Sequence, residues 1–156
     1  MPVTSVTKDP EALTLTLVAD FPVPQRRLWE AWADPRQLER FWGPPSAPAT
    51  FTHHDFRVGG RAEYFLTGPD GEKWSGAWKF TAVHPIDSFE ADDGEDNAED
   101  EDMPMSMTFA FETTPTGSRM ISVTRFSSVE AMEQTTPGME EGLRAAMPQL
   151  DEVLAG

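Results

Sequence analysis

The chain has 156 residues and carries 12 Lys and Arg against 27 Asp and Glu, which gives a formal net charge of −15. A chain this acidic repels phosphate backbones, and it contains no cysteine, so nucleic acid is excluded as an expected partner and disulfides as expected crosslinks. It has no apolar run near the roughly 20 residues of a membrane span and no export signal, so we expect a single cytoplasmic domain over residues 1–156.

The first third of the chain predicts a strand followed by two short helices. Residues 1–10 show no periodicity and are interpreted as a loose lead-in. Apolar residues alternate with polar ones over residues 13–21, which is typical of a strand with one buried face. Pro24 suits the start of a first helix, and Asp34 followed by Pro35 suits the N-cap and first position of a second.

The middle of the chain predicts an antiparallel meander of short strands joined by tight turns. The candidate strands lie at residues 49–57, 61–67, 74–82, 88–91, 105–111 and 119–126. An acidic segment, residues 90–104, separates two of them and has nine carboxylates within residues 90–102. It lacks the spacing of a calcium-binding loop, so we interpret it as a solvated loop.

The last stretch, PGMEEGLRAAMPQLDEVL, predicts a long amphipathic helix over residues 137–154 that covers the apolar face of the strands. Thr136 suits its N-cap, after a separate short helical turn over residues 127–134. Pro148 lies well inside this helix and lacks the N–H that would bond the Arg144 carbonyl, which predicts a kink there.

Five motifs in this order resemble the START-like, helix-grip superfamily of polyketide-cyclase-like (SRPBCC) proteins. They are Leu28–Trp32, Phe41–Pro44, Asp55–Gly60, Gly68–Gly71 and Met139–Asp151. Within the superfamily the chain is similar to bacterial proteins grouped with activators of the heat-shock-protein-90 ATPase. The resemblance implies an α+β helix-grip fold: a curved antiparallel sheet of about six to seven strands wrapped round a long C-terminal helix, two short helices after the first strand, and often an apolar cavity.

The candidate site is the space between the sheet and the long helix, where aromatic and methionine side chains are expected to meet. His53 and Tyr64 would be its polar contacts. A filled core is the alternative interpretation of the same side chains. The predicted lining consists of Trp42, His53, Tyr64, Leu66, Trp78, Met107, Met139, Leu143 and Met147.

The remaining histidines and charged residues give weaker signals. His53 and His54 are adjacent, so on a strand they face opposite sides and cannot share one metal ion; we predict no metal site and no cofactor. Asp55 and Arg57 are interpreted as an ion pair that fixes a strand end, and the alternative is a polar group at the cavity mouth.

Three hypotheses of function follow. The first is a protein that binds an apolar or amphipathic small molecule in the cavity. The second is a cyclase- or hydrolase-type enzyme that uses His53 as general acid or base, because histidine titrates near neutrality. The third is a chaperone-related module that binds a protein partner through the acidic loop or an exposed apolar patch. The resemblance does not decide among them, because the fold carries lipid binders, cyclases, hydrolase-like enzymes and co-chaperone modules.

Overall fold

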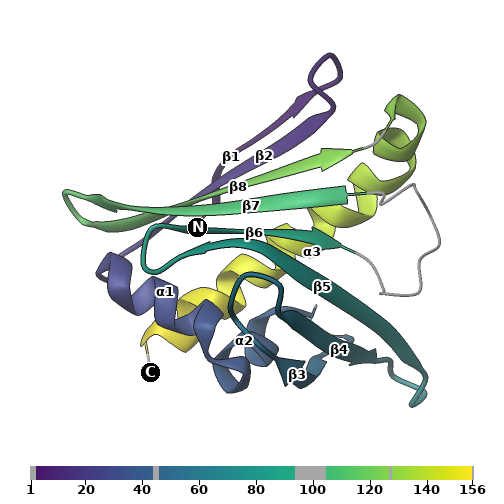
Figure 1. The fold of residues 1–156 in the computed structure, drawn as a ribbon, viewed down its shortest axis with the longest axis horizontal. Coiled ribbons are helices and arrows are strands. Elements are labelled where there is room, and N and C mark those ends of the chain that lie inside the picture. The colour runs from purple at the N-terminus through teal and green to yellow at the C-terminus, as the bar shows by residue number, and fades with distance from the viewer. Residues whose placement is uncertain (1–2, 44–45, 94–104, 127, 156) are drawn as a thin grey trace.

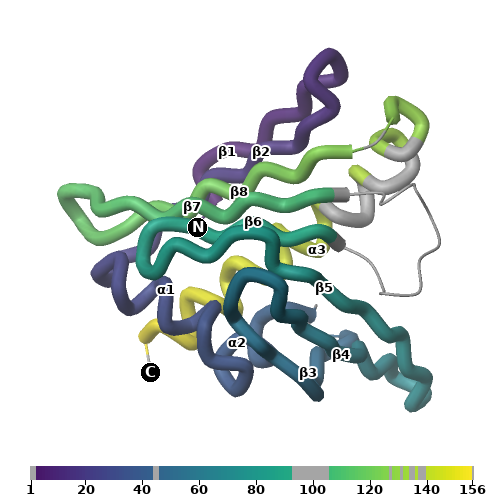
Figure 2. Tube along the Cα trace, viewed as in Figure 1, coloured from purple at the N-terminus to yellow at the C-terminus, as the bar shows by residue number. Residues whose placement is uncertain are grey.

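The computed structural model describes residues 3–43, 46–93, 105–126 and 128–155 (Figure 1). Helix α3 crosses one face of a single sheet and ends beside α1 and α2, as Figure 2 also shows. The expected α+β class, with an antiparallel sheet and a C-terminal helix, is confirmed. The elements are, in chain order, β1 (Val3–Asp9), β2 (Thr14–Phe21), α1 (Gln25–Ala33), α2 (Pro35–Phe41), β3 (Ala49–His54), β4 (Arg61–Thr67), β5 (Lys73–His84), β6 (Ser88–Asp93), β7 (Met105–Thr114), β8 (Gly117–Phe126) and α3 (Val129–Ala155).

The sheet contains eight strands in the order β1-β2-β8-β7-β6-β5-β4-β3, one strand more than the upper estimate from the sequence. All neighbouring strands are antiparallel, and β2 pairs with β8, so the N-terminal hairpin extends the meander on its far side. Strand β6 includes the first residues of the expected acidic loop, and residues 94–104 of that loop lie outside the described residues.

The additional strand is β1, so the expectation of a loose lead-in is wrong for residues 3–9. Val3 and Val6 both pack against the core although they are three residues apart. A register shift between Val3 and Ser5 allows this, because a bulge moves the alternation by one residue. The segment therefore lacks the two-residue period by which strands are recognised in a sequence.

Helix α3 is longer than expected and has no interruption before Pro137. It includes residues 129–134 of the expected separate turn, and Thr136 lies inside the helix instead of capping it. The Thr136 hydroxyl donates to the Met132 carbonyl at 2.6 Å, one turn earlier. Figure 1 shows the helix axis changing direction in its first part, which contains Pro137 and so lacks one backbone donor.

The helix also continues without a break through Pro148, where the sequence predicts a kink. Pro148 and Arg144 are both exposed, and on an exposed helix face water can bond a carbonyl that has lost its N–H partner, which lowers the cost of the proline. The next residue, Gln149, donates from Nε2 to the Gly43 carbonyl at 2.8 Å and fixes this part of α3 to the end of α2.

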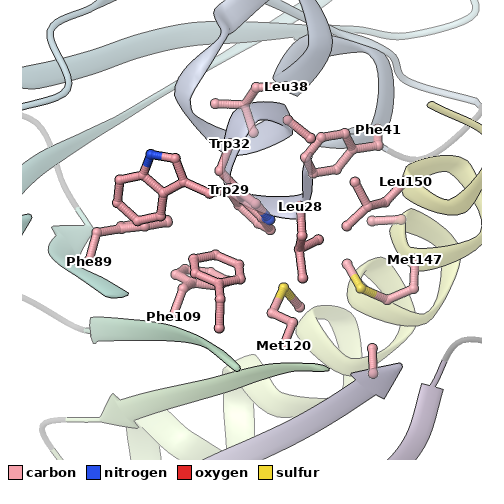
Figure 3. Close-up of a cluster of buried hydrophobic side chains, with 14 of the residues drawn as sticks. Leu28, Trp29, Trp32, Leu38, Phe41, Phe89, Phe109, Met120, Met147 and Leu150 are labelled. Carbon is pink, nitrogen blue, oxygen red and sulfur yellow. The ribbon is translucent and has the colours of Figure 1, made fainter. Parts of the chain in front are cut away.

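Beneath α1 and α2, aromatic side chains fill the inner face of the sheet (Figure 3). The Phe109 ring centroid lies 4.6 Å from that of Trp32 and 4.9 Å from that of Phe89. Met147 and Leu150 of α3 meet this cluster from the other side. Truncation of such a buried aromatic side chain costs about 3–5 kcal/mol, so this cluster is the main contribution to holding the helices on the sheet.

Gln25 connects the start of α1 to strand β7 and to the turn between β5 and β6. Its Nε2 donates to the carbonyl oxygens of Ile86 and Phe111, both at 2.9 Å. The Thr113 hydroxyl donates to Gln25 Oε1, also at 2.9 Å. Since Pro24 provides no side-chain cap, these bonds determine where α1 leaves the sheet.

We expect Gln25→Ala to lower the free energy of unfolding by about 2 kcal/mol, because it leaves two half-buried carbonyl groups without donors. Urea denaturation measures this effect. Thr113→Val is the control, since it removes one hydroxyl bond to the same side chain and should cost about 0.5–1 kcal/mol. An effect of Gln25→Ala no larger than that of the control would contradict the anchoring role.

Candidate functional site

The inner face of β4 and β5 carries a wall of predicted site residues. The Trp42 ring centroid lies 4.5 Å from that of Trp78 and 6.1 Å from that of Tyr64, and Leu66 packs against the same cluster. Trp78 is 1% exposed, whereas Trp42, Tyr64 and Leu66 are half-buried. The structure therefore brings these four residues together and leaves part of three of them in contact with solvent.

Tyr64 lies across Gly76, its cross-strand partner on β5. A Cβ atom at Gly76 would clash with the Tyr64 ring, so glycine at this position lets the ring lie against the sheet. Trp74, which pairs with Leu66 on the same face, is 51% exposed and continues the wall to the end of the hairpin.

The remaining apolar residues of the predicted lining come from β7 and α3. Met107, Leu143 and Met147 are buried in the core cluster. The side chain of Met139 lies outside the described residues. Figure 3 shows that Met147 points toward the aromatic cluster, beside Leu150.

His53 is not in the interior: its side chain is exposed on the opposite face of β3. The reason is a register shift between Phe51 and His53, which places Thr52 and His53 both outside and turns His54 inward. The expected polar contact of the cavity is therefore corrected from His53 to its neighbour, His54, as the histidine that faces the core.

His54 lies in an aromatic environment. Its ring is stacked on Phe56 at a centroid distance of 5.4 Å and lies 5.7 Å from the Phe80 ring. Its Nε2 is 3.2 Å from the Trp32 carbonyl, so this nitrogen carries the proton, and the buried Nδ1 has no hydrogen-bond partner among the described residues. Burial lowers the pKa of His54, opposed by the Trp32 carbonyl and by Asp34.

Sequence reasoning missed the hydroxyl groups of β8. Ser122 and Thr124 are 1% and 2% exposed, and they face the interior opposite Phe109 and Met107 of β7. The alternation of β8 was visible in the sequence, but both of its faces carry apolar residues: Ile121 and Val123 on one, Met120 and Phe126 on the other. Only the pairing with β7 and β2 settles which face is inside.

A groove of about 390 Å³ lies on the outer side of the helices, between α2, the start of β3 and the end of α3. Its lining is mixed and contains both charged side chains and small apolar ones. None of the predicted site residues lines it. The lining residues are Glu39, Arg40, Pro48, Ala49, Gln149, Glu152 and Val153.

The strand end after β3 carries an ion pair. Arg57 Nε donates to Asp55 Oδ2 at 2.8 Å, which confirms the expected ion pair; Arg57 is largely exposed, so the pair contributes little stability.

Within the described ranges, no three His, Asp or Glu side chains are grouped closely enough to hold a metal ion. No helix in these ranges has the length and apolar character needed to cross a bilayer.

Residues 22–155 match the family described as Activator of Hsp90 ATPase homolog 1-like protein. The chain belongs to this family. The crystal structure of protein Ms6760 from Mycobacterium smegmatis is 44% identical to this family member, with a TM-score of 0.89 over 99% of this chain and 98% of that one. The solution structure of a protein from Arthrobacter aurescens is 43% identical, with a TM-score of 0.87 over 98% and 92% of the two chains.

A more distant AHSA1-like protein from Aeromonas hydrophila shares 18% identity and a TM-score of 0.70 over 91% of this chain and 92% of its own. At that identity the likeness concerns the fold alone, which agrees with the START-like helix-grip architecture of this family member. A search of curated proteins gave no match.

We expect this family member to lose stability as the pH falls below the ordinary histidine value of 6.5. Because the pKa of His54 is lowered in the folded state, the unfolded chain takes up a proton at a pH where the folded chain does not. His54→Gln removes this linkage and keeps an N–H for the Trp32 carbonyl, so the variant should lose less stability than the wild type between about pH 7.5 and pH 5.

Urea denaturation at several pH values measures the difference. His53→Gln is the matched control, since that side chain is exposed one residue away, and its profile should follow the wild type. Parallel profiles for wild type and His54→Gln would show that His54 is not held neutral by its surroundings.

Proposed function

We propose that this family member binds an apolar or amphipathic small molecule between the sheet and α3. The observation that supports this most is the wall of Trp42, Tyr64 and Leu66. These three side chains lie on the inner face of the fold, yet each keeps part of its surface exposed. A large apolar surface that faces inward and is still open to solvent is typical of the mouth of a ligand site.

The interior under α1 and α2 is packed with aromatic rings, whereas the interior under α3 contains side chains that can adapt to a ligand. Under α1 and α2, rings such as Trp32 and Phe109 pack closely against one another. Under α3, the lining contains Met107 and Met147, whose unbranched side chains adapt to a bound molecule at low cost. The proposed lining is therefore Trp42, Tyr64, Leu66, Trp78, Met107, Leu143 and Met147, with Met139 included from the sequence.

A cyclase or hydrolase that uses the same cavity is the alternative. It needs an internal acid or base, and His53, which the sequence predicts for this role, is exposed. His54 faces inward, but its Nε2 is bonded to the Trp32 carbonyl, which leaves only Nδ1 for chemistry. A chaperone-related interaction through the acidic loop rests on residues 94–104, outside the described residues, and a cytoplasmic location stays a prediction from the sequence.

We expect naphthalene, a small apolar probe, to bind saturably and to shift the amide resonances of Arg61–Thr67, Lys73–His84 and α3. Tyr64→Leu should weaken its binding roughly 3-fold to 10-fold, because the ring of Tyr64 supplies an aromatic face at the mouth. Heteronuclear NMR titration measures both the position of the shifts and the affinity.

Phe65→Leu is the matched control, because Phe65 is the next residue on β4 and faces the other side of the sheet, with Lys73 Nζ 4.6 Å from its ring centroid. Its affinity for naphthalene should stay within about two-fold of the wild type. Absence of saturable shifts, or shifts confined to the groove around Arg40 and Glu152, would overturn the proposal.

A further inference from the structure

The groove between α2, the start of β3 and the end of α3 is separate from the proposed cavity, since the two have no lining residue in common. Its volume of about 390 Å³ lies within the range of small-molecule sites, about 300–1,000 Å³. Two of its apolar lining residues, Ala49 and Val153, are 7% and 3% exposed, so their side chains belong to the packed body of the fold. The groove is therefore a second place where the molecule can hold a small ligand.

The elements around the groove are joined to one another. Glu39 on α2 accepts the Phe51 N–H of β3 at 3.0 Å through Oε1. Gln149 on α3 donates from Nε2 to the Gly43 carbonyl, just after α2, at 2.8 Å. Because these bonds connect all three elements, a small molecule can bind here without the cost of ordering the groove.

Two side chains of opposite charge line the groove without pairing. Arg40 lies in the last turn of α2, and Glu152 lies in the last turn of α3. Both are exposed, and neither forms a hydrogen bond or an ion pair with any residue in the described part of the chain. Glu39 differs, because its Oε2 lies 3.4 Å from Arg36 Nη1. The groove thus offers a guanidinium group and a carboxylate group that are both available to a ligand.

Glu152 lies where a carboxylate is unfavourable. The C-terminal end of a helix carries a partial negative charge and favours cations. Helix α3 has no basic residue in its last turn, and the protein as a whole has a net charge of −15. An ammonium group bound beside Glu152 would compensate both the carboxylate and the helix end.

Arg40 provides the complementary charge. A guanidinium group binds a carboxylate through two parallel N–H donors and keeps its charge throughout the physiological pH range. A ligand with a carboxylate alone would be repelled by Glu152 and the end of α3, and a ligand with an ammonium group alone would be repelled by Arg40. A ligand that carries both charges avoids both penalties.

We infer that this groove is a binding site for a small zwitterion of the α-amino acid type. Its carboxylate pairs with Arg40, its ammonium group pairs with Glu152, and a short apolar side chain lies against Ala49 and Val153. The site is additional to the proposed cavity and does not depend on it.

The test uses three probes with the same branched alkyl group: L-leucine, 3-methylbutylamine and 4-methylpentanoate. The second lacks only the carboxylate of leucine, and the third lacks only its ammonium group. Near pH 7, L-leucine should bind saturably at concentrations up to about 10 mM and shift the amide resonances of Arg40, Ala49, Gln149 and Val153. Each of the other probes should bind about 10-fold more weakly, because it loses one charge-assisted hydrogen-bonded pair. Heteronuclear NMR titration measures the affinities and locates the shifts.

Two single variants assign the two charges. Arg40→Gln should weaken L-leucine binding about 10-fold and remove its advantage over 3-methylbutylamine, which has no carboxylate to lose. Glu152→Gln should weaken L-leucine binding by a similar factor and remove its advantage over 4-methylpentanoate. Both side chains are exposed, so both variants should fold like the wild type.

Arg26→Gln and Glu141→Gln are the matched controls. They make the same changes in net charge, and both residues are exposed on helices α1 and α3 but lie outside the groove. Their affinities for L-leucine should stay within about two-fold of the wild type. Equal losses in the controls and in the groove variants would trace the effect to net charge and overturn the inference.

Failure of L-leucine to bind saturably would overturn the inference, and so would shifts confined to Arg61–Thr67 and Lys73–His84. If either 3-methylbutylamine or 4-methylpentanoate binds as tightly as L-leucine, the groove does not select a zwitterion and the inference is wrong. The naphthalene titration of the cavity has no bearing on these outcomes, so the two proposals can fail separately.

Discussion

Everything inside this fold depends on which face each strand turns toward α3. A strand exposes alternate side chains to alternate faces, so one bulge reverses the assignment for every residue that follows it. Register shifts occur in β1 after Val3, in β3 after Phe51, and between Phe80 and Ala82 in the pairing of β5 with β6. The first brings a short polar segment into the sheet, and the second exchanges His53 for His54 in the interior. These shifts decide which polar atoms lie inside.

The interior contains different kinds of side chain under α1 and α2 than under α3. Under α1 and α2, close ring contacts such as those of Trp32 with Phe109 fix the helices to the sheet, and the Gln25 bonds set the position of α1. Under α3, methionine side chains contribute as well: Met132 packs against Leu15 and Phe126, and Met147 lies beside Leu150. A rigid aromatic half can support a site in the other half without taking part in it, because its side chains are locked by mutual packing.

Regular alternation explains what the sequence could predict. The inward faces of β2 and of β5 near Trp78 follow the two-residue period, and the Asp34 cap was evident from its chemistry, since Asp34 Oδ1 accepts the Arg36 N–H at 3.0 Å. The rest depended on long-range pairing. Nothing local distinguishes a bulge after Phe51 from a regular strand, so His53 was assigned inside. In β8 both faces are plausible from composition, and only the neighbours β2 and β7 put Ser122 inside.

Helix α3 is held over the sheet at both of its ends. Its start is held where Met132 packs against Leu15 and Phe126, and its end where Arg27 Nη2 donates to the Val153 carbonyl at 2.9 Å. With both ends fixed, the height of the helix above the sheet is set by these two contacts. How much of the space between them is filled then depends on the size of the strand side chains. Small residues on the inner face, Ser122 and Thr124 among them, fill less of it than the rings of the neighbouring strands.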